Sequence, residues 1–331
     1  MPLPPLIQRT PKGLYCAAGD FFIDPWAPVY KAIITHAHSD HARAGSQQYL
    51  CHHHSVPLLQ LRLGNHAYQG IAWNQPVHIN GVSVSLHPAG HIIGSSQVRI
   101  AYKGEVWVVS GDYKLENDGL SGAFEPVTCH TFVTESTFGL PIYTWQPQAA
   151  VYAQMQQWVL NNQANGITSV LIAYSLGKAQ RVVQALHPVA KQIFVHGAIA
   201  NTHDALLRAG CQLPQVHTIS AQTPVSALKG TVVIAPPSTL DTAWMQRFAP
   251  YATGICSGWM QVRGNVKRSN ADAAFVLSDH ADWPGLLQAI KATQAQKVWV
   301  THGFQSVLSR YLNEQGIEAD EITTQFGAEE V

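Results

Sequence analysis

The chain has 331 residues, more than one hydrophobic core usually holds, so we expect one large domain with an insertion, or two domains. Charged residues make up 12% and apolar residues 46%, which predicts a well-buried globular protein and argues against a disordered one. The formal net charge of zero argues against a protein that coats nucleic acid through bulk charge, although it leaves local charge at a site open.

The five cysteines are scattered and show no C-x-x-C spacing, which predicts reduced thiols in a cytoplasmic protein. Residues 1–5 have neither a basic start nor an apolar segment, and no stretch approaches the ~18 continuous apolar residues of a membrane span. We therefore expect no signal peptide and no membrane as a partner.

The first distinctive stretch is T-H-A-H-S-D-H at residues 35–41, which directly follows a predicted buried strand at 29–34. Burying three imidazoles and a carboxylate at a strand end costs free energy unless these groups have partners. The same side chains are typical ligands of divalent metal ions. The alternative is a hydrogen-bonded polar cluster on a loop.

Within this stretch, His36 and His38 lie two apart in extended chain and can point the same way. Asp40 and His41 fall where we expect a helix over 42–50 to begin, so they are aimed at a second point nearby. The spacing therefore favours two metal ions over one.

Two neighbouring segments contain further polar residues. Asp24 ends a predicted strand at 20–24 and is either a residue that orients a metal-binding histidine or a turn residue before Pro25. The triplet at 52–54 consists of three histidines, whose side chains would alternate between opposite faces of extended chain. We interpret this triplet as a polar loop.

A strand at 82–86 leads to the segment H-P-A-G-H-I-I-G, in which His91 is the better ligand candidate and His87 is better explained as a hydrogen-bonded core residue. A hairpin with strands at 98–102 and 105–109 follows, and Asp112 comes just after it. A carboxylate in that place can bridge two metal ions, although alone it is more typical of a turn.

The middle of the chain alternates strands with helices, which predicts a parallel sheet covered on both faces. The predicted strands are 169–174, 192–195 and 231–235, and the predicted helices are 176–186 and 202–209. A strand at 298–301 and a helix at 306–313 then return the chain to the first domain and bring back His302.

Two segments of this middle region could contact phosphate. Ser175 and Lys178 lie where a strand turns into a helix, a place with free amides, although an ordinary turn explains them equally well. The cations Arg263, Lys267 and Arg268 form the densest basic run, which is either a solvated loop or a contact for a nucleic-acid backbone.

The motifs around residues 36–41, His91 and Asp112, taken in order, resemble the ligand set of the metallo-β-lactamase superfamily. T-E-S-T-F-G at 134–139 resembles the motif that opens the β-CASP region of its nucleic-acid-processing members, and S-D-H-A-D at 278–282 and V-T-H-G at 300–303 resemble those that close it. The residues of these motifs are most similar to those of the bacterial ligase-associated DNA exonuclease family.

This resemblance implies an α/β fold, an αββα sandwich at 1–139 and 269–331 with a β-CASP domain inserted at 140–268. It also implies two divalent metal ions, zinc or manganese. The implied ligands are His36, His38 and His91 for the first ion, Asp40, His41 and His302 for the second, and Asp112 as the bridge.

The resemblance further implies that His280 is a general acid, that Glu135 orients it, and that Asp40 is needed for turnover. The expected function is a DNA exonuclease of DNA repair that acts on single-stranded DNA or free ends, with an ATP-dependent DNA ligase and a helicase as partners. His302 leaves an RNA-processing nuclease as the alternative, because RNA-processing members resemble this chain at that position. A small-molecule hydrolase and a non-catalytic scaffold are the alternatives from other classes.

Overall fold

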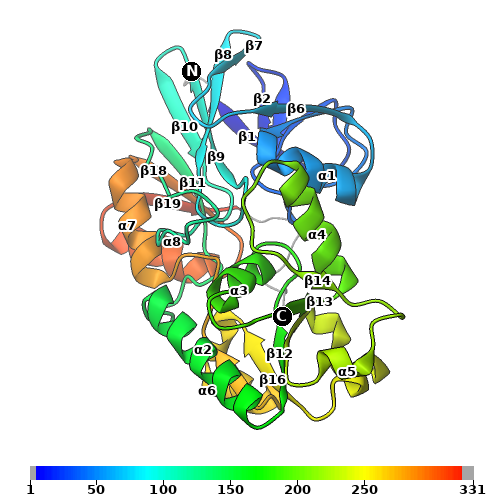
Figure 1. The fold of residues 1–331 in the computed structure, drawn as a ribbon. Coiled ribbons are helices and arrows are strands. Elements are labelled where there is room, and N and C mark those ends of the chain that lie inside the picture. Colours follow the sequence, from blue (N-terminus) through cyan, green and yellow to red (C-terminus); the bar gives the residue numbers. More distant parts are fainter. Residues whose placement is uncertain (1–4, 323–331) are drawn as a thin grey trace. The chain divides into compact units, whose positions relative to one another are not determined.

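The protein has a mixed α/β fold in the computed structural model, which describes residues 5–322 (Figure 1). The chain forms two compact units. The first consists of the residues up to Thr144 and those from His280 onward, and the second is the intervening segment from Trp145 to Asp279. The second unit is therefore inserted in the sequence of the first.

The first unit contains two sheets, each with a mixture of parallel and antiparallel neighbours. One sheet has the order β1 (Ile7–Thr10), β2 (Gly13–Cys16), β3 (Phe21–Ile23), β4 (Lys31–Ile33), β5 (Gln48–His52), β6 (Ala67–Ile71). The other has the order β19 (Glu318–Glu321), β18 (Lys297–Thr301), β11 (Thr131–Glu135), β10 (Glu105–Val109), β9 (Ser96–Tyr102), β8 (Val82–Pro88), β7 (Val77–Ile79).

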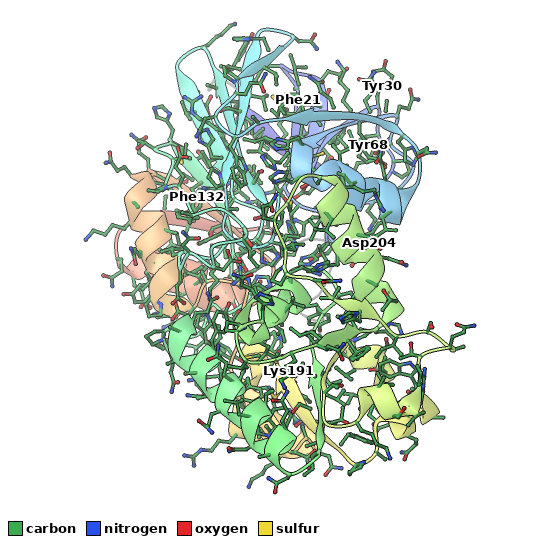
Figure 2. The ribbon with its side chains drawn as sticks, viewed as in Figure 1. Phe21, Tyr30, Tyr68, Phe132, Lys191 and Asp204 are labelled. Carbon is green, nitrogen blue, oxygen red and sulfur yellow. The ribbon has the colours of Figure 1, made fainter. Side chains whose placement is uncertain are left out.

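The two sheets share a hydrophobic core, because alternate side chains of each strand point inward. Ile23 and Ile33 from one sheet join Val84, Val98 and Val133 from the other in this cluster. Figure 2 labels Phe21, which belongs to the same cluster and is fully buried.

Helices cover the opposite face of the second sheet. Phe132, also labelled in Figure 2, joins a separate cluster with Leu286 of α7 (Trp283–Thr293) and Leu308 of α8 (Gln305–Glu314). In the other sheet, α1 (Val56–Leu63) follows the short 3-10 turn η1 (His53–Ser55) and contacts β6. The first unit is thus built from two packed sheets with helices outside them.

The predicted hairpin is confirmed, since β9 and β10 pair antiparallel with Tyr102 opposite Glu105. Lys103 (φ 49°) and Gly104 (φ 86°) form its turn, and both have the positive φ that a tight two-residue hairpin turn requires. The strands predicted at 20–24, 29–34, 82–86 and 298–301 are present with boundaries shifted by at most two residues.

The helix predicted at 42–50 is wrong. The chain turns through residues 42–47 and enters β5 at Gln48. Gly45 has a φ of 97° and packs so tightly that an added Cβ would lie 2.9 Å from the Pro28 ring. Tyr49 is then buried as a strand residue, so packing of the sheet overrides the local helical pattern.

The second unit contains one sheet in which every pair of neighbours is parallel. Its order is β14 (His217–Thr218), β13 (Ile193–Val195), β15 (Val232–Ala235), β12 (Thr168–Ile172), β16 (Tyr251–Cys256), β17 (Ala273–Phe275). Leu171 of β12 joins one buried cluster, whereas its neighbours Val170 and Ile172 join another, so both faces of the sheet are covered. The predicted parallel sheet is confirmed.

The helices of this unit are α2 (Gln148–Ala164), α3 (Lys178–Leu186), α4 (Gly197–Arg208), α5 (Val225–Leu228) and α6 (Arg263–Ser269), with the 3-10 turns η2 (Pro237–Thr239), η3 (Ala243–Phe248) and η4 (Gly258–Gln261). The sequence did not predict α2, and α4 begins five residues before the predicted helix at 202–209. Because β17 pairs with β16, the unit extends to Asp279 and not to Arg268, where we expected the insertion to end.

Among the described residues, no helix has the length and apolar character that crossing a membrane would require.

Candidate metal centre

The polar residues predicted as ligands all follow strands of the first unit. His36, His38, Asp40 and His41 come after β4, and His91 comes after β8. Asp112 follows β10 and His302 follows β18, whereas Glu135 is the last residue of β11. Since β10, β11 and β18 are parallel neighbours, their carboxyl ends meet at one edge of the sheet.

A first group gathers His36, His38, His91 and Asp112, whose ligand atoms all lie within 4.8 Å of one another. The Nδ1 atom of His38 lies 3.1 Å from Nε2 of His36 and 3.0 Å from Nε2 of His91. His36 and His91 are fully buried. Three ring nitrogens therefore converge on one point.

A second group contains His41, His302 and Asp112, again with ligand atoms within 4.8 Å of one another, and Asp40 lies beside it. The Nε2 atom of His41 is 3.5 Å from Oδ2 of Asp40 and 3.4 Å from Oδ1 of Asp112. The rings of His41 and His302 stack with their centroids 4.9 Å apart.

Asp112 lies between the groups. Its Oδ2 atom is 3.4 Å from Nε2 of His36 and 3.7 Å from Nε2 of His91, while its Oδ1 atom faces His41. Each carboxylate oxygen thus faces a different group of imidazoles, as a bridging ligand of two ions requires.

The spacing and hydrogen bonding of these side chains are better explained by metal binding than by contacts among the side chains themselves. In a tetrahedral zinc site with bonds of about 2.0–2.1 Å, neighbouring ligand nitrogens lie about 3.3 Å apart, close to the spacings in the first group. In the second group, Oδ1 of Asp40 and Nε2 of both His41 and His302 are buried without a hydrogen-bond partner in the described part of the chain. Buried polar atoms are rarely left so, because the loss of hydration is costly. The two clusters could therefore hold metal ions.

Burial also keeps most of these imidazoles neutral, the form that binds a metal. It lowers the pKa of His36 to about 4, and it lowers the pKa values of His91 and His302. Although burial opposes the shift, the charge of His41 holds the pKa of Asp112 well below its usual range, so this carboxyl is ionised.

Asp24 contacts His41 of the second group on the side of the ring that faces away from Asp112. Its Oδ2 atom accepts a hydrogen bond from Nδ1 of His41 at 2.7 Å and one from the Thr35 hydroxyl at 2.6 Å, while Oδ1 accepts from the Thr35 amide at 2.8 Å. Against the effect of burial, the carboxylates of Asp112, Asp40 and Asp24 raise the pKa of His41 well above its usual value. A metal ion would therefore displace a proton from Nε2 of His41, while Asp24 holds the proton on Nδ1. Sequence reasoning missed Thr35, although its place between the strand and the first histidine was a usable signal.

His302 is held in an unusual backbone conformation, with a φ of 53°. The Ser136 hydroxyl donates to the His302 carbonyl, and Thr301 Oγ1 lies 3.2 Å from Nδ1 of the ring. At Gly303 an added Cβ would lie 2.2 Å from the Ser136 carbonyl oxygen. Such a left-handed turn is costly for a non-glycine residue and persists only where its surroundings impose it.

His280 and Glu135 form a pair beside the first group. Nδ1 of His280 donates to Oε2 of Glu135 at 2.9 Å, and Oε1 of Glu135 accepts from the Tyr113 amide at 2.7 Å. Burial, with the charge of Asp112 adding to it, raises the pKa of Glu135 against the opposing effect of His280. The His280 ring lies 4.5 Å from the His91 ring, and its side chain is 18% exposed.

The other predicted histidines lie apart from these groups. His87 contacts Ser85 at 3.0 Å and Glu125 at 3.3 Å, as expected for a hydrogen-bonded residue. The triplet at 52–54 does converge, with ligand atoms within 4.8 Å, because a 3-10 turn begins at His53 and ends the alternation of the strand. Nδ1 of His52 accepts from the His54 amide, so the cluster also caps this turn.

The turn before α3 differs from the expected phosphate site. Ser175 is partly exposed, but Lys178 is buried and its ammonium lies 2.8 Å from Oδ1 of Asp279. The Gly177 amide donates to the side chain of Gln180. The groups that a phosphate would need therefore already have partners within the protein.

The basic run forms α6, and Arg263, Lys267 and Arg268 are all exposed on it. The second unit contains nine Lys and Arg and four Asp and no Glu, so its formal charge is nine minus four, or +5. The first unit has the remaining eleven basic and sixteen acidic residues, or −5. The net charge of zero thus conceals two units of opposite charge.

Comparisons with known proteins find relatives named for a DNA ligase and relatives named for ribonucleases. No protein-family model matches the chain. A protein of Opitutus terrae named "Probable DNA ligase" is 30% identical over 311 residues, which are 93% of this chain and 30% of that protein. "Endoribonuclease YSH1" of Saccharomyces cerevisiae is 26% identical over 118 residues, 35% of this chain and 15% of that protein. "RNase aCSPSF2" of Saccharolobus solfataricus is 28% identical over 122 residues, 36% of this chain and 24% of that protein.

The chain therefore spans only a minor part of the length of each of these relatives. Among solved structures, a protein of unknown function from Enterococcus faecalis V583 has a TM-score of 0.61 at 14% identity, with 90% of this chain and 80% of that chain covered. At this identity the likeness shows a shared fold alone.

Proposed function

We propose that the chain is a metal-dependent phosphodiesterase of the β-CASP branch of the metallo-β-lactamase superfamily, and that it degrades DNA from free ends. One observation carries the proposal: a carboxylate, Asp112, lies between two clusters of metal-binding groups, with the His280 and Glu135 pair beside them. Two clusters, a bridge and a neighbouring proton donor are what hydrolysis of a phosphodiester needs.

The fold supports the assignment to that branch. The first unit has two packed sheets with helices outside, as in an αββα sandwich, and the inserted unit is a parallel α/β sheet. The relatives named endoribonuclease and RNase match within the same chain. A small-molecule hydrolase would leave the inserted unit and the pair of His280 and Glu135 without a role.

In this proposal His36, His38 and His91 would hold one ion, Asp40, His41 and His302 would hold the other, and Asp112 would contact both. Two divalent ions, zinc or manganese, would supply an activated water and positive charge for binding the phosphodiester. Asp24 fixes the proton of His41 on Nδ1.

His280 supplies the proton for the leaving oxygen. In this proposal Nε2 of His280 donates that proton, because Nδ1 is engaged by Glu135. The ionised Glu135 carboxylate stabilises the protonated ring and sets its orientation.

DNA is the proposed substrate because the relative that matches 93% of the chain bears the name of a DNA ligase, whereas the relatives named for RNA match about a third of it. A similar segment within a ligase-named protein also supports a DNA ligase as a partner, and we include a helicase on the resemblance of the motifs alone. The exposed cations of α6 would contact backbone phosphates of single-stranded DNA or of free DNA ends. The net charge of +5 on the second unit would attract this backbone.

RNA processing is the second candidate. Two of the relatives named above are named for ribonuclease activity. The V-T-H-G motif at 300–303 also resembles that of RNA-processing members, which have a histidine at this position. The two candidates share the metal centre and differ in the substrate.

The test is product analysis on matched single strands of DNA and RNA, labelled in turn at each end, with zinc or manganese added separately. Stepwise loss of nucleotides from one end of DNA, with RNA intact, supports the DNA exonuclease and gives its polarity. Preferential cleavage of RNA supports the second candidate. Equal product from the wild type and Asp40→Ala contradicts the two-metal mechanism. No product with either ion contradicts the proposed enzyme and favours a scaffold.

A further inference from the structure

The histidine triplet at 52–54 has no role in the proposed chemistry. Its residues lie where β5 ends and the 3-10 turn η1 begins, just before α1. His52 is 1% exposed, His54 is partly exposed and His53 is exposed. Each ring offers a ligand atom, and the three atoms lie within 4.8 Å of one another. The triplet thus forms a compact group of imidazoles that extends from the interior to the surface.

Capping of the turn does not account for this group. The His54 amide donates to Nδ1 of His52 over a long distance of 3.4 Å, so the cap uses one nitrogen of one ring. Nδ1 of His53 lies 3.4 Å from the Ile71 carbonyl, an acceptor that keeps a proton on Nδ1 and leaves the lone pair on Nε2. A backbone carbonyl commonly orients metal-binding histidines in this way. An ion at Nδ1 of His52 would replace the long hydrogen bond there.

The rings are supported by their neighbours. The centroid of the His53 ring lies 4.1 Å from that of His52 and 4.2 Å from that of His54. Trp73 stacks on His52 with centroids 4.2 Å apart and an interplanar angle of 15°, and its Nε1 donates to the Ser96 hydroxyl at 2.9 Å. The buried ring of His52 is thus held in one orientation, which favours metal binding because less freedom is lost when the ion binds.

Close packing also fixes the backbone of the triplet. β5 and β6 pair in parallel, and an added Cβ at Gly70 of β6 would lie 2.9 Å from the Cα atom of His53. The Ser55 hydroxyl donates to the Gly94 carbonyl at 3.0 Å, which anchors the end of the turn. The fold of the first unit therefore imposes the turn that brings the rings together.

The composition of the triplet selects the kind of ligand. Burial, and after it the charges of His53 and His54, lower the pKa of His52 to about 3, and burial together with His53 lowers the pKa of His54. Both rings are therefore neutral near neutral pH, and the neutral form is the one that binds a metal. Magnesium and calcium prefer oxygen ligands, whereas three imidazole nitrogens suit a borderline ion such as zinc, nickel or copper.

We propose that His52, His53 and His54 form a third metal site, which binds one borderline divalent ion such as zinc and ties the end of β5 to the start of α1. A zinc site usually has four ligands, so water fills the position left by the three imidazoles. The site shares no residue with the two groups around Asp112, and no step of the proposed hydrolysis depends on it. The site can therefore exist whether or not the protein is a nuclease.

Zinc content provides the first test. Metal-depleted wild type and the double variant His53→Gln with His54→Gln are dialysed against zinc at about 10 µM, which fills a site with a dissociation constant of about 1 µM to about nine-tenths. We expect the double variant to bind one ion fewer than the wild type, whatever number the other groups hold. Zinc should also raise its unfolding temperature less, because it lacks an ion that stabilises the native state. His52 stays unchanged in this test because it is buried and caps the turn.

Two other histidines of the first unit provide a matched control. His66 is partly exposed and His78 is exposed, as His54 and His53 are. We expect His66→Gln with His78→Gln to bind as many ions as the wild type and to gain as much stability from zinc. Equal zinc content in the wild type and the triplet variant overturns the site. An equal loss in both double variants means adventitious binding to surface histidines only, and it overturns the site as well.

Chemical modification of the wild type tests the same residues without a substitution. Diethyl pyrocarbonate reacts with an imidazole nitrogen that has a free lone pair, and mass spectrometry of peptide fragments locates the product. At a zinc concentration about ten times the dissociation constant, the modification rates of His53 and His54 should fall about tenfold, while that of His78 stays the same. Unchanged modification of His53 and His54 at saturating zinc overturns the site, even if the double variant has lost zinc for another reason.

Discussion

Replacing Asp24 with asparagine tests how the protein prepares His41 for a metal. The amide has one acceptor oxygen where the carboxylate has two. If that oxygen keeps the bond from the Thr35 amide, the NH₂ group faces Nδ1 of His41, which lies 2.7 Å from Oδ2 of Asp24. Nδ1 must then accept, so the neutral ring carries its proton on Nε2.

That proton blocks the atom that faces Asp112 at 3.4 Å and has no hydrogen-bond partner among residues 5–322. We therefore expect affinity for the second ion to fall about 10- to 100-fold, the usual effect of losing such an orienting partner. This corresponds to about 1.4–2.7 kcal/mol. The assay is zinc titration of metal-depleted Asp24→Asn, together with the rise in unfolding temperature that zinc causes, because a ligand of the native state stabilises it.

Asp20→Asn is the matched control. Asp20 and Asp24 both have positive φ, 53° and 42°, a conformation that asparagine tolerates, and Asp20 is exposed with a single bond from the Tyr15 hydroxyl. The control should bind zinc as the wild type does. Unchanged zinc affinity in Asp24→Asn, or an equal decrease in both variants, would refute the reasoning about the His41 proton.

Three further predictions follow from the same centre. Asp40→Ala should abolish turnover while circular dichroism shows a retained fold, because its Oδ1 atom has no partner in the described residues to lose; residual turnover above about 1% would contradict this. His280→Ala should lower kcat on nucleic acid about 10²- to 10⁴-fold with zinc content unchanged, and loss of zinc would instead make it a ligand. Gly303→Ala should lower the free energy of unfolding, measured with denaturant, more than Gly104→Ala does. Both glycines have positive φ, so each substitution costs about 1–2 kcal/mol for the backbone conformation. At Gly303 the added Cβ also clashes with the Ser136 carbonyl, whereas the space at Gly104 is open. Equal costs would mean that the contact at Ser136 relaxes freely.

The sequence was most informative where several polar residues of one chemical kind follow strands. Neither His91 nor Asp112 is near His36 in the sequence, yet both could be assigned to one site because the motifs, taken in order, resemble the ligand set of the metallo-β-lactamase superfamily. The structure brings these side chains together as expected. Whether they bind metal stays a prediction for the zinc experiments.

The elements that sequence reasoning missed have identifiable causes. The segment 42–50 reads as helical locally, but its conformation is decided by sheet pairing and by the close approach of Gly45 to Pro28. In α2 the signal was present, since Val151, Met155 and Val159 recur every four residues and are buried, but intervening glutamines obscured it.

The partner of Lys178 could not be read from the sequence at all. A lysine at a helix start is equally suited to a phosphate or to a buried carboxylate, and Asp279 is contributed by a distant part of the chain. The choice depends on tertiary burial, which no local pattern encodes.

The pairing of β11 with β18 has a consequence for the order in which the protein is made. Thr131 pairs with Lys297, and the chain between them contains the whole second unit. During translation, the whole second unit is therefore synthesised before β18, an inner strand of the sheet to which β11 belongs. Because domains generally fold as units, the second unit can fold before this sheet is complete. His302 lies beyond the inserted unit in the sequence, so it is synthesised after the other members of the second group and after the whole second unit. The second group can therefore be complete only after the inserted unit has been made.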